Sequence, residues 1–316
     1  MRVMVLGGTG FIGSHVAAAL RARGHAVLIG TRYPKRALAK LPASLRDCDL
    51  RETHFESLTT RYVWQPLLRD VDAVVNAAGI LRERGAETFE RVNSMAPGAL
   101  ALACERAGLR LVHVSALGLR PRAYSRFIRS KAAAERAIAD TGADYSIVRP
   151  SLLDGEGGYA AAWLRKVARW PVHCVPAAAR GRLAALDVRD LGEAIAVLCE
   201  ARGKTEWREV DLGGSARRTF AEHLDALCER PHPALRVPLP NFFALGGAAL
   251  CDLLHVTPYG VAALELLWRD NLPKANLLPT LLGRAPAPVG VFRTRAASPA
   301  VSPATAGRAW WAGPST

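Results

Sequence analysis

A glycine-rich turn near the start of the chain constrains the fold more than any other feature. The apolar run 3–6 leads directly into residues 7–13 (GGTGFIG), and apolar residues then recur at helical spacing at Ile12, Val16 and Leu20. A strand, a glycine turn and a helix in this order are typical of a dinucleotide-binding site. The glycines let the backbone turn sharply beside a pyrophosphate, and the N–H groups at the start of the helix face its charge. The predicted cofactor contacts in this turn are Gly7, Thr9, Gly10, Phe11, Ile12 and Gly13.

The residues after the second apolar run, 26–29, favour NADP(H) over NAD(H). An NAD-selective site has an acidic residue at this place to hold the ribose hydroxyls. Segment 30–36 (GTRYPKR) has no carboxylate. Arg32 instead offers a planar fork that suits a 2′-phosphate, with Lys35 or Arg36 as a second cation. The alternative interpretation is that these are solvated charges in an arginine-rich chain.

Apolar runs alternate with helical stretches through residues 1–150, which predicts parallel strands joined by right-handed crossovers. Further strands are expected at 46–50, 71–75, 109–114 and 145–148, and helices at 58–68, 87–107 and 126–141. We therefore predict an α/β fold: a Rossmann-type doubly wound parallel sheet with a smaller, mostly helical C-terminal substrate-side region. The expected parts are a dinucleotide-binding core over 1–150, a helical region over 151–284 that interleaves with it, and a disordered tail over 285–316.

Strand ends at one edge of the predicted sheet supply further cofactor contacts. In open parallel sheets, ligands bind at the carboxyl ends of the strands. Residues 76–79 (NAAG) follow the β-branched run 71–75, and their small side chains let the backbone approach a ligand. The alternative is an ordinary turn from strand to loop. The contacts predicted at such strand ends are Asp49, Leu50, Ala77, Ala78 and Gly79.

The composition favours a cytoplasmic protein and gives no sign of a nucleic-acid or metal site. The net charge is +14, but the arginines are spread over the whole length, so we interpret them mainly as solvated and expect no nucleic-acid partner. Six dispersed cysteines form no C-x-x-C pair, and eight histidines show no metal-ligand spacing. The apolar run 242–254 contains Asp252 and is too short to span a bilayer. We expect a soluble protein, or one peripheral to the inner face of a membrane.

Taken together, the motifs resemble the short-chain dehydrogenase/reductase superfamily. The resemblance rests on residues 7–13, 76–79, Ser115, 129–135 (RSKAAAE, which contains Lys131) and 149–150 (Arg-Pro), and it covers roughly residues 1–230. Within the superfamily the chain is similar to the atypical extended branch that includes the NAD(P)H-binding accessory subunit of respiratory complex I and its bacterial relatives. The resemblance implies that Lys131 holds the nicotinamide ribose, that Ser115 completes a catalytic site, and that Pro150 lies beside the cofactor.

The tyrosine that the superfamily places four residues before the lysine is absent. Phe127 occupies that position and cannot exchange a proton with a substrate. Tyr124 is the nearest phenol, seven residues before Lys131, which is about 10 Å along a helix axis. An irregular turn before the helix would be needed to bring it inward. The candidate catalytic residues are therefore Ser115, Lys131 and Tyr124.

The sequence leaves the activity open between classes. One interpretation is an NADP(H)-linked oxidoreductase, such as a reductase of a sugar-nucleotide or quinone pathway, with an altered active site; an isomerase would need the same missing phenol. The other is a non-catalytic NADP(H)-binding protein with a structural, assembly or regulatory role. Segment 238–267 predicts two helices with more apolar residues than one buried face requires. These helices are expected to pack on the core, to bind a membrane complex or to rest on a membrane surface. The small-molecule substrate cannot be identified from these residues.

Overall fold

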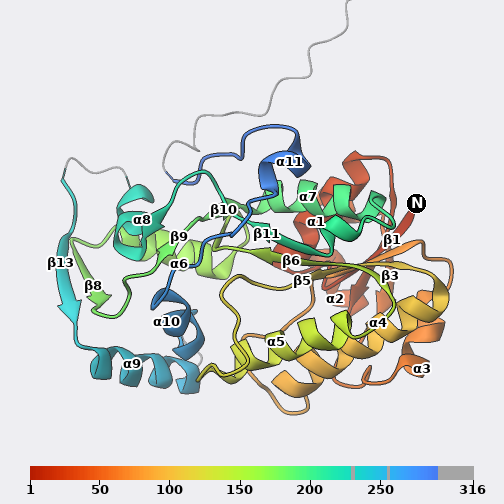
Figure 1. Ribbon diagram of the computed structural model, residues 1–316, viewed down its shortest axis with the longest axis horizontal. Coiled ribbons are helices and arrows are strands. Elements are labelled where there is room, and N and C mark those ends of the chain that lie inside the picture. The colour runs from red at the N-terminus through yellow and green to blue at the C-terminus, as the bar shows by residue number, and fades with distance from the viewer. Residues whose placement is uncertain (229–231, 255–256, 291–316) are drawn as a thin grey trace, which may run out of the picture.

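The computed structural model describes residues 1–228, 232–254 and 257–290 (Figure 1). Its main sheet has seven parallel strands in the order β11-β6-β5-β4-β1-β2-β3. The strands of this sheet are β1 (Arg2–Leu6), β2 (Ala26–Thr31), β3 (Asp49–Glu52), β4 (Ala73–Asn76), β5 (Arg110–Val114), β6 (Asp144–Pro150) and β11 (Glu209–Leu212). The predicted Rossmann-type doubly wound fold is confirmed.

The strand β1 lies at the centre of the sheet and separates two cores. Its side chains alternate between the two faces, as the period of a strand requires. Val3 and Val5 belong to one buried cluster, and Met4 and Leu6 belong to the other. All four are fully buried, and each contributes roughly 1.5–3 kcal/mol by leaving water.

Helices cover both faces of the sheet. The face of Val3 is covered by α1 (Phe11–Ala22), α7 (Val188–Glu200) and α11 (Leu278–Leu282), and the face of Met4 by α3 (Arg61–Trp64), α4 (Ala96–Ala107) and α5 (Arg126–Ala139). The other helical segments near the sheet are α2 (Pro34–Lys40), η1 (Ala43–Leu45), η2 (Gln65–Leu68), η3 (Phe89–Met95) and η4 (Thr205–Trp207). The chain leaves β1 for β2 on one side, and β4 pairs with β1 on the other. This reversal is the point at which open α/β sheets bind ligands.

The C-terminal elements gather beyond the carboxyl ends of the strands. They are α6 (Tyr159–Ala168), α8 (Phe220–Ala226), α9 (Asn241–Leu254) and α10 (Val261–Leu267), with the short strands β7 (Leu153–Asp154), β8 (Val172–Pro176), β9 (Arg182–Leu183), β10 (Leu186–Asp187), β12 (Arg218–Thr219) and β13 (Leu235–Leu239). Thr219 caps α8 and exchanges hydrogen bonds with Glu222, the capping box that the spacing indicates. In Figure 1, α9 lies at the end of the molecule farthest from β3.

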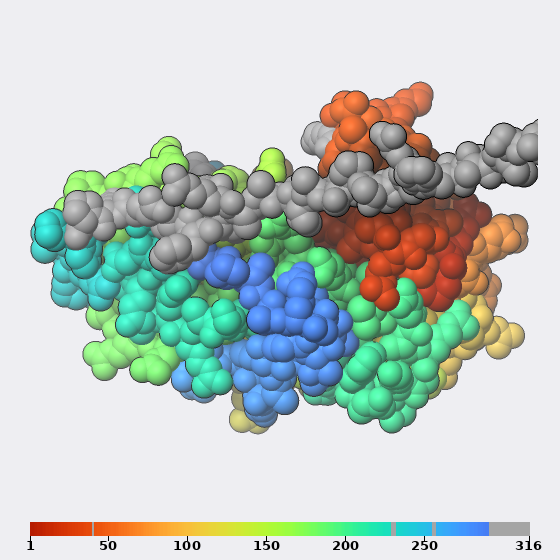
Figure 2. Space-filling view, turned by 90° about the horizontal axis from the view of Figure 1, so that it is seen from above, coloured from red at the N-terminus to blue at the C-terminus, as the bar shows by residue number. Residues whose placement is uncertain are grey.

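The beginning of the expected tail is packed against the core. Arg284 pairs with Asp190 of α7 at 2.8 Å, and the N–H of Ala287 donates to the same carboxylate at 2.6 Å. Val289 is buried. Figure 2 shows this blue segment lying against the green middle of the chain. A buried carboxylate supplied by a distant helix therefore orders residues that composition alone assigns to a tail; residues 291–316 lie outside the described part.

Candidate cofactor and active site

The glycine turn has the geometry that a pyrophosphate needs. Gly7 has a φ of +71°, and its N–H donates to Gly30 at 3.1 Å, while the N–H of Gly10 donates to Gly7 at 2.9 Å. A Cβ on Gly13 would lie 2.2 Å from the oxygen of Gly7, so the turn can close on α1 only with glycine there. Gly10 caps α1 without a side-chain acceptor. The first N–H groups of α1 are therefore left to bind an anion, which fits the phosphates of a dinucleotide.

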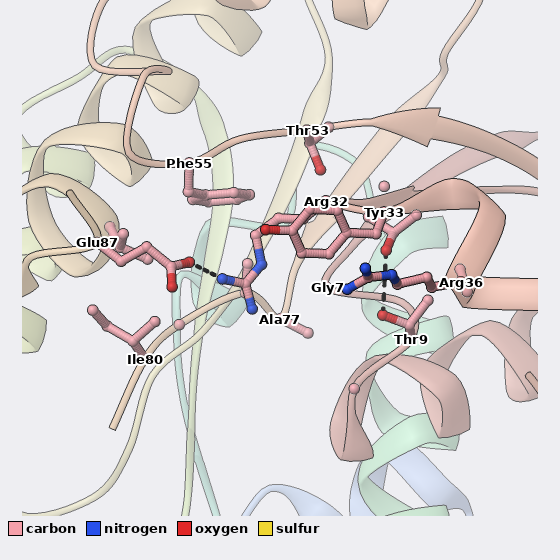
Figure 3. A pocket seen from close by; sticks show the side chains of 17 residues that line it. Gly7, Thr9, Arg32, Tyr33, Arg36, Thr53, Phe55, Ala77, Ile80 and Glu87 are labelled. Atoms are coloured by element: carbon pink, nitrogen blue, oxygen red, sulfur yellow. Dashed lines mark hydrogen bonds and ion pairs between the residues drawn. The ribbon is translucent and has the colours of Figure 1, made fainter. Parts of the chain in front are cut away.

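A crevice of about 420 Å³ opens along this turn (Figure 3). It runs over the carboxyl ends of β1, β2 and β4, and a Cβ on Gly7 would lie 3.0 Å from the backbone of Ala78. The backbone is thus close enough to cradle a flat ligand. Its lining includes these predicted cofactor residues: Gly7, Thr9, Gly10, Arg32, Arg36, Ala77, Ala78 and Gly79.

Charged side chains gather at the β2 end of the crevice. Arg32 reaches across it and pairs with the carboxylate of Glu87, as Figure 3 shows. Arg36 stays on its own side, where its guanidinium lies 5.5 Å from the ring centre of Tyr33. Thr53, at the end of β3, completes this part of the lining. The predicted cations are therefore in place, but one of them already has an anionic partner.

A second cavity of about 350 Å³ begins at the same glycine turn. Phe11, Ile12, Ser115, Phe127 and Pro150 line it, whereas Gly10 lines the crevice, so neighbouring residues of the turn line the two cavities. We call this second cavity the apolar cleft. Its remaining walls come mainly from leucine and aromatic side chains of the C-terminal region, among them Leu152, Leu164, Leu183, Phe220, Tyr259, Leu266 and Leu267.

Ser115 is held by a partly buried ion pair at the bottom of the site. Its hydroxyl donates to Glu135 at 2.5 Å, and Arg149 grips the same carboxylate with bonds of 2.7 to 3.1 Å. Glu135 follows Lys131 by one helical turn of α5, so both project from the same face. The pair therefore fixes the position of Ser115 beside the apolar cleft.

Lys131 is buried, and its Nζ donates to the carbonyl of Val114 at 3.0 Å. Burial lowers the pKa of this ammonium to about 8, although the nearby Glu135 opposes the shift. A Cβ on Gly79 would lie 3.5 Å from the same Nζ. Lys131 thus lies directly behind the end of β4 at the edge of the crevice, where the ribose of a dinucleotide is expected.

The structure does not bring Tyr124 to this site. Its side chain is 79% exposed and lies edge-on against Trp268, with ring centres 6.2 Å apart. The reason is Glu265 of α10, whose buried carboxylate accepts the N–H groups of Tyr124 and Ser125 at 3.0 and 2.9 Å. These bonds fix the loop with the phenol outward. Phe127 does line the cleft, and its ring packs against Phe89.

Asp49 and Leu50 also lie away from the crevice. The strand β3 begins at Asp49 and runs to Glu52, so Asp49 is at the amino edge of the sheet, where it pairs with Arg2 at 2.9 Å. Leu50 packs on the core. The strand therefore begins three residues later than the apolar pattern suggests, and Thr53 has the position at the crevice that was expected of Asp49.

Two site residues were missed from the sequence. Glu87 lies 55 positions from its partner Arg32, and Glu265 lies 141 positions from Tyr124. No local pattern marks either of them. The four-residue spacing from Lys131 to Glu135, in contrast, is a signal that could have indicated a shared helix face.

The described residues show neither a metal-binding group nor a membrane-spanning helix. They contain no group of three or more His, Cys, Asp or Glu side chains that could hold a metal ion. In the same ranges, the helices are all too short or too polar to cross a membrane.

Comparison with known proteins gives one family and several relatives. A family model described as NAD(P)H-binding matches residues 7–166. A ceramide reductase of Caulobacter vibrioides is 29% identical, over 89% of this chain and 90% of that protein. Subunit 9 of the mitochondrial NADH dehydrogenase [ubiquinone] 1 alpha subcomplex of Arabidopsis thaliana is 26% identical, over 87% of this chain and 69% of that protein.

Solved structures agree on the fold. A nucleoside-diphosphate-sugar epimerase from Staphylococcus aureus superposes with a TM-score of 0.65, over 91% of this chain and 98% of that chain. Its sequence is 18% identical, so the likeness concerns the architecture alone. The overall fold is thus shared with this structure.

Proposed function

The chain belongs to the NAD(P)H-binding family, of the extended short-chain dehydrogenase/reductase type, and from this premise we propose that it is an NADP(H)-linked reductase of a carbonyl group on a largely apolar substrate. The observation that carries the proposal is that neighbouring residues of the glycine turn line the crevice and the apolar cleft. A nicotinamide in this arrangement would lie at the mouth of a hydrocarbon-lined space.

The lining of the cleft supports a lipid-like substrate. Leucine and aromatic side chains make up most of the lining, so few groups besides Arg182, Arg269 and Asn271 can pair with the hydroxyl and phosphate groups of a sugar nucleotide. Unpaired polar groups are costly to bury. One relative is named a ceramide reductase, and a ceramide is a lipid with long hydrocarbon chains. A substrate of the quinone type also fits this lining, because it carries carbonyl groups on an apolar skeleton.

Ser115 and Lys131 are the residues that we assign to the reacting end of the cleft. When bound, NADPH supplies the hydride. Ser115 would turn its hydroxyl from Glu135 to the carbonyl oxygen and give it the proton that the product alcohol needs, and solvent that reaches the cleft would then return a proton to the serine. Lys131 orients the ribose from behind Gly79. At a pH below its pKa of about 8, its ammonium adds positive charge to the site.

Arg32 and Arg36 support the preference for NADP(H) over NAD(H). Both line the crevice at the end of β2, where a 2′-phosphate would lie. Segment 30–36 itself offers no carboxylate to the ribose hydroxyls.

The reductase proposal predicts turnover that depends on chain length. Purified protein mixed with NADPH should reduce long-chain keto lipids at least tenfold faster, by kcat/KM, than short, water-soluble analogues, because each buried CH₂ adds about 0.8 kcal/mol of binding.

Phe127→Tyr should raise kcat by about tenfold or more, since it restores a phenol one helical turn before Lys131. Consumption of NADPH, followed by its absorbance, measures both.

Tyr124→Phe is the matched control for this test. The ring of Tyr124 lies outside the cleft, so loss of its hydroxyl should change kcat by less than about twofold. Turnover that disappears in Tyr124→Phe would contradict the assignment of the proton to Ser115. Tight binding of NADPH without consumption of any carbonyl would refute the reductase proposal.

One observation favours a second candidate function. Phe127 removes the usual acid at a site that otherwise matches the family, and one relative is a subunit of a respiratory complex. A non-catalytic protein that binds NADP(H) would keep the crevice and stabilise its fold by mass action. This candidate predicts a large thermal shift with NADPH and no turnover in the assay above.

We also propose that α9 rests on an anionic lipid surface at the cytoplasmic face of a membrane. Its outer face exposes six large apolar side chains: Phe242, Phe243, Leu245, Leu250, Leu253 and Leu254. Asp252 is the one charged residue in the helix, and it is turned to Arg82 and the N–H of Val261. The net charge of +14 complements anionic headgroups, and a lipid substrate would come from the same surface.

This placement predicts a charge-dependent association with vesicles. The protein should sediment with vesicles of phosphatidylcholine and phosphatidylglycerol, and more weakly with phosphatidylcholine alone. Replacement of Phe242 and Phe243 by glutamate should lower the bound fraction at least tenfold in partition coefficient, because two aromatic side chains leave the interface. Tyr62→Glu, on α3 at the opposite end of the molecule, should leave it unchanged. Equal binding by the two variants would refute the role of α9.

A further inference from the structure

Glu87 is held rigidly at the rim of the crevice. It closes a tight turn with Arg84, in which the two residues exchange backbone hydrogen bonds of 3.1 and 3.0 Å. Gly85, inside the turn, has a φ of +54°. The same loop is tied down by Glu83, which accepts the N–H of Phe89 at 2.7 Å. The carboxylate of Glu87 is therefore presented to the crevice by a fixed backbone.

Arg32 reaches this carboxylate from the other side. Its guanidinium pairs with Glu87 across the space that the ribose end of a dinucleotide would fill, as Figure 3 shows. The side chain of Arg32 is 45% exposed and that of Glu87 21%, so the pair lies at the mouth rather than in the core. Arg36 is turned to Tyr33 and has no such partner among the ion pairs of the described residues.

We propose that Glu87 determines how strongly this protein prefers NADPH, because it competes with the 2′-phosphate for Arg32. The inference rests on the proposed function, which places that phosphate at Arg32. The carboxylate of Glu87 takes up one end of the Arg32 guanidinium and neutralises part of its charge, so the phosphate meets a cation that already has an anionic partner. A phosphate ester carries about −1.5 to −2 charges near neutral pH, and the carboxylate beside Arg32 repels it. NADH has a neutral hydroxyl at that position, so the carboxylate of Glu87 does not repel it.

The test measures the dissociation constants of NADPH and NADH by the quenching of protein fluorescence. Glu87→Gln keeps the shape of the side chain and removes its charge. It should lower the dissociation constant of NADPH by about threefold to fivefold, the upper end of the worth of an exposed ion pair, and change that of NADH by less than about twofold. In an Arg32→Ala background the same change should have less than about a twofold effect on NADPH. Glu90→Gln, an exposed carboxylate outside the crevice lining, is the matched control.

Each outcome bears on one of the two proposals. A wild type that binds NADPH better than NADH, with no tightening in Glu87→Gln, overturns the role of Glu87 and leaves the cofactor proposal intact. Equal tightening of both dinucleotides, or tightening that persists without Arg32, also overturns it. A wild type that prefers NADH, or binds neither dinucleotide, overturns the proposed NADP(H) function itself.

Discussion

Gly13→Ala should abolish detectable binding of NADPH and destabilise the fold. The new Cβ would lie 2.2 Å from the oxygen of Gly7 and 2.7 Å from the Cα of Gly8, and both contacts are with backbone that cannot move aside. The turn must open to accept the methyl group, and forced overpacking of this kind costs roughly 1–3 kcal/mol or more. The N–H groups that should hold the pyrophosphate move with the turn. Urea unfolding and NADPH titration measure the two effects.

Gly247→Ala provides the control, because it adds the same methyl group to a helix where no atom lies within 4 Å. It should leave binding unchanged and stabilise α9 by about 0.5–1 kcal/mol. If Gly13→Ala binds NADPH as tightly as the wild type, the pyrophosphate does not lie on this turn. The cofactor site, and with it the proposed reductase, would then have to be abandoned.

Lys131→Met should slow turnover strongly and, at neutral pH, stabilise the protein without cofactor. Burial lowers the pKa of Lys131 from 10.5 to about 8, which corresponds to a penalty of roughly 3 kcal/mol for keeping the buried ammonium charged. Methionine has a similar volume and no charge, but it forfeits the hydrogen bond to Val114, worth about 1 kcal/mol. A net gain of about 1–2 kcal/mol is expected. The loss of an oriented ribose should lower kcat/KM by about 10²-fold.

The pH dependence of this gain is specific. Because the pKa of Lys131 is lower in the folded than in the unfolded state, its penalty is complete below pH 8. Between pH 8 and 10.5 the unfolded state binds more protons, so the free energy of unfolding of the wild type rises relative to that of the variant. The advantage of Lys131→Met should therefore vanish by about pH 10.5.

Lys166→Met is the matched control, since that lysine is exposed on α6. It should change the free energy of unfolding by less than about 0.5 kcal/mol at any pH between these limits. A stability difference for Lys131→Met that stays constant from pH 7 to pH 10.5 would show that the buried charge is not its source. Full activity of the variant would remove Lys131 from the proposed mechanism.

The short-range features of the structure could be predicted well. The glycine turn, the alternation of strands and helices, the capping box of Thr219 and Glu222, and the two helices on either side of Pro258 all follow from residues within one or two turns of one another. The crevice followed as well, because strand order and chirality place the ends of β1, β2 and β4 together. The catalytic and cofactor roles of the individual residues stay predictions.

Neighbours in sequence thus decided where the backbone turns and which edge of the sheet could receive a dinucleotide, since propensity and period act over a few residues. The tertiary structure alone decided which charged side chains lie in contact. It paired Arg32 with Glu87, turned Tyr124 outward on Glu265, and joined leucines from distant segments into the apolar cleft. Such contacts depend on the packing of whole layers, which brings together side chains that lie tens or hundreds of positions apart and that carry no local signal of one another.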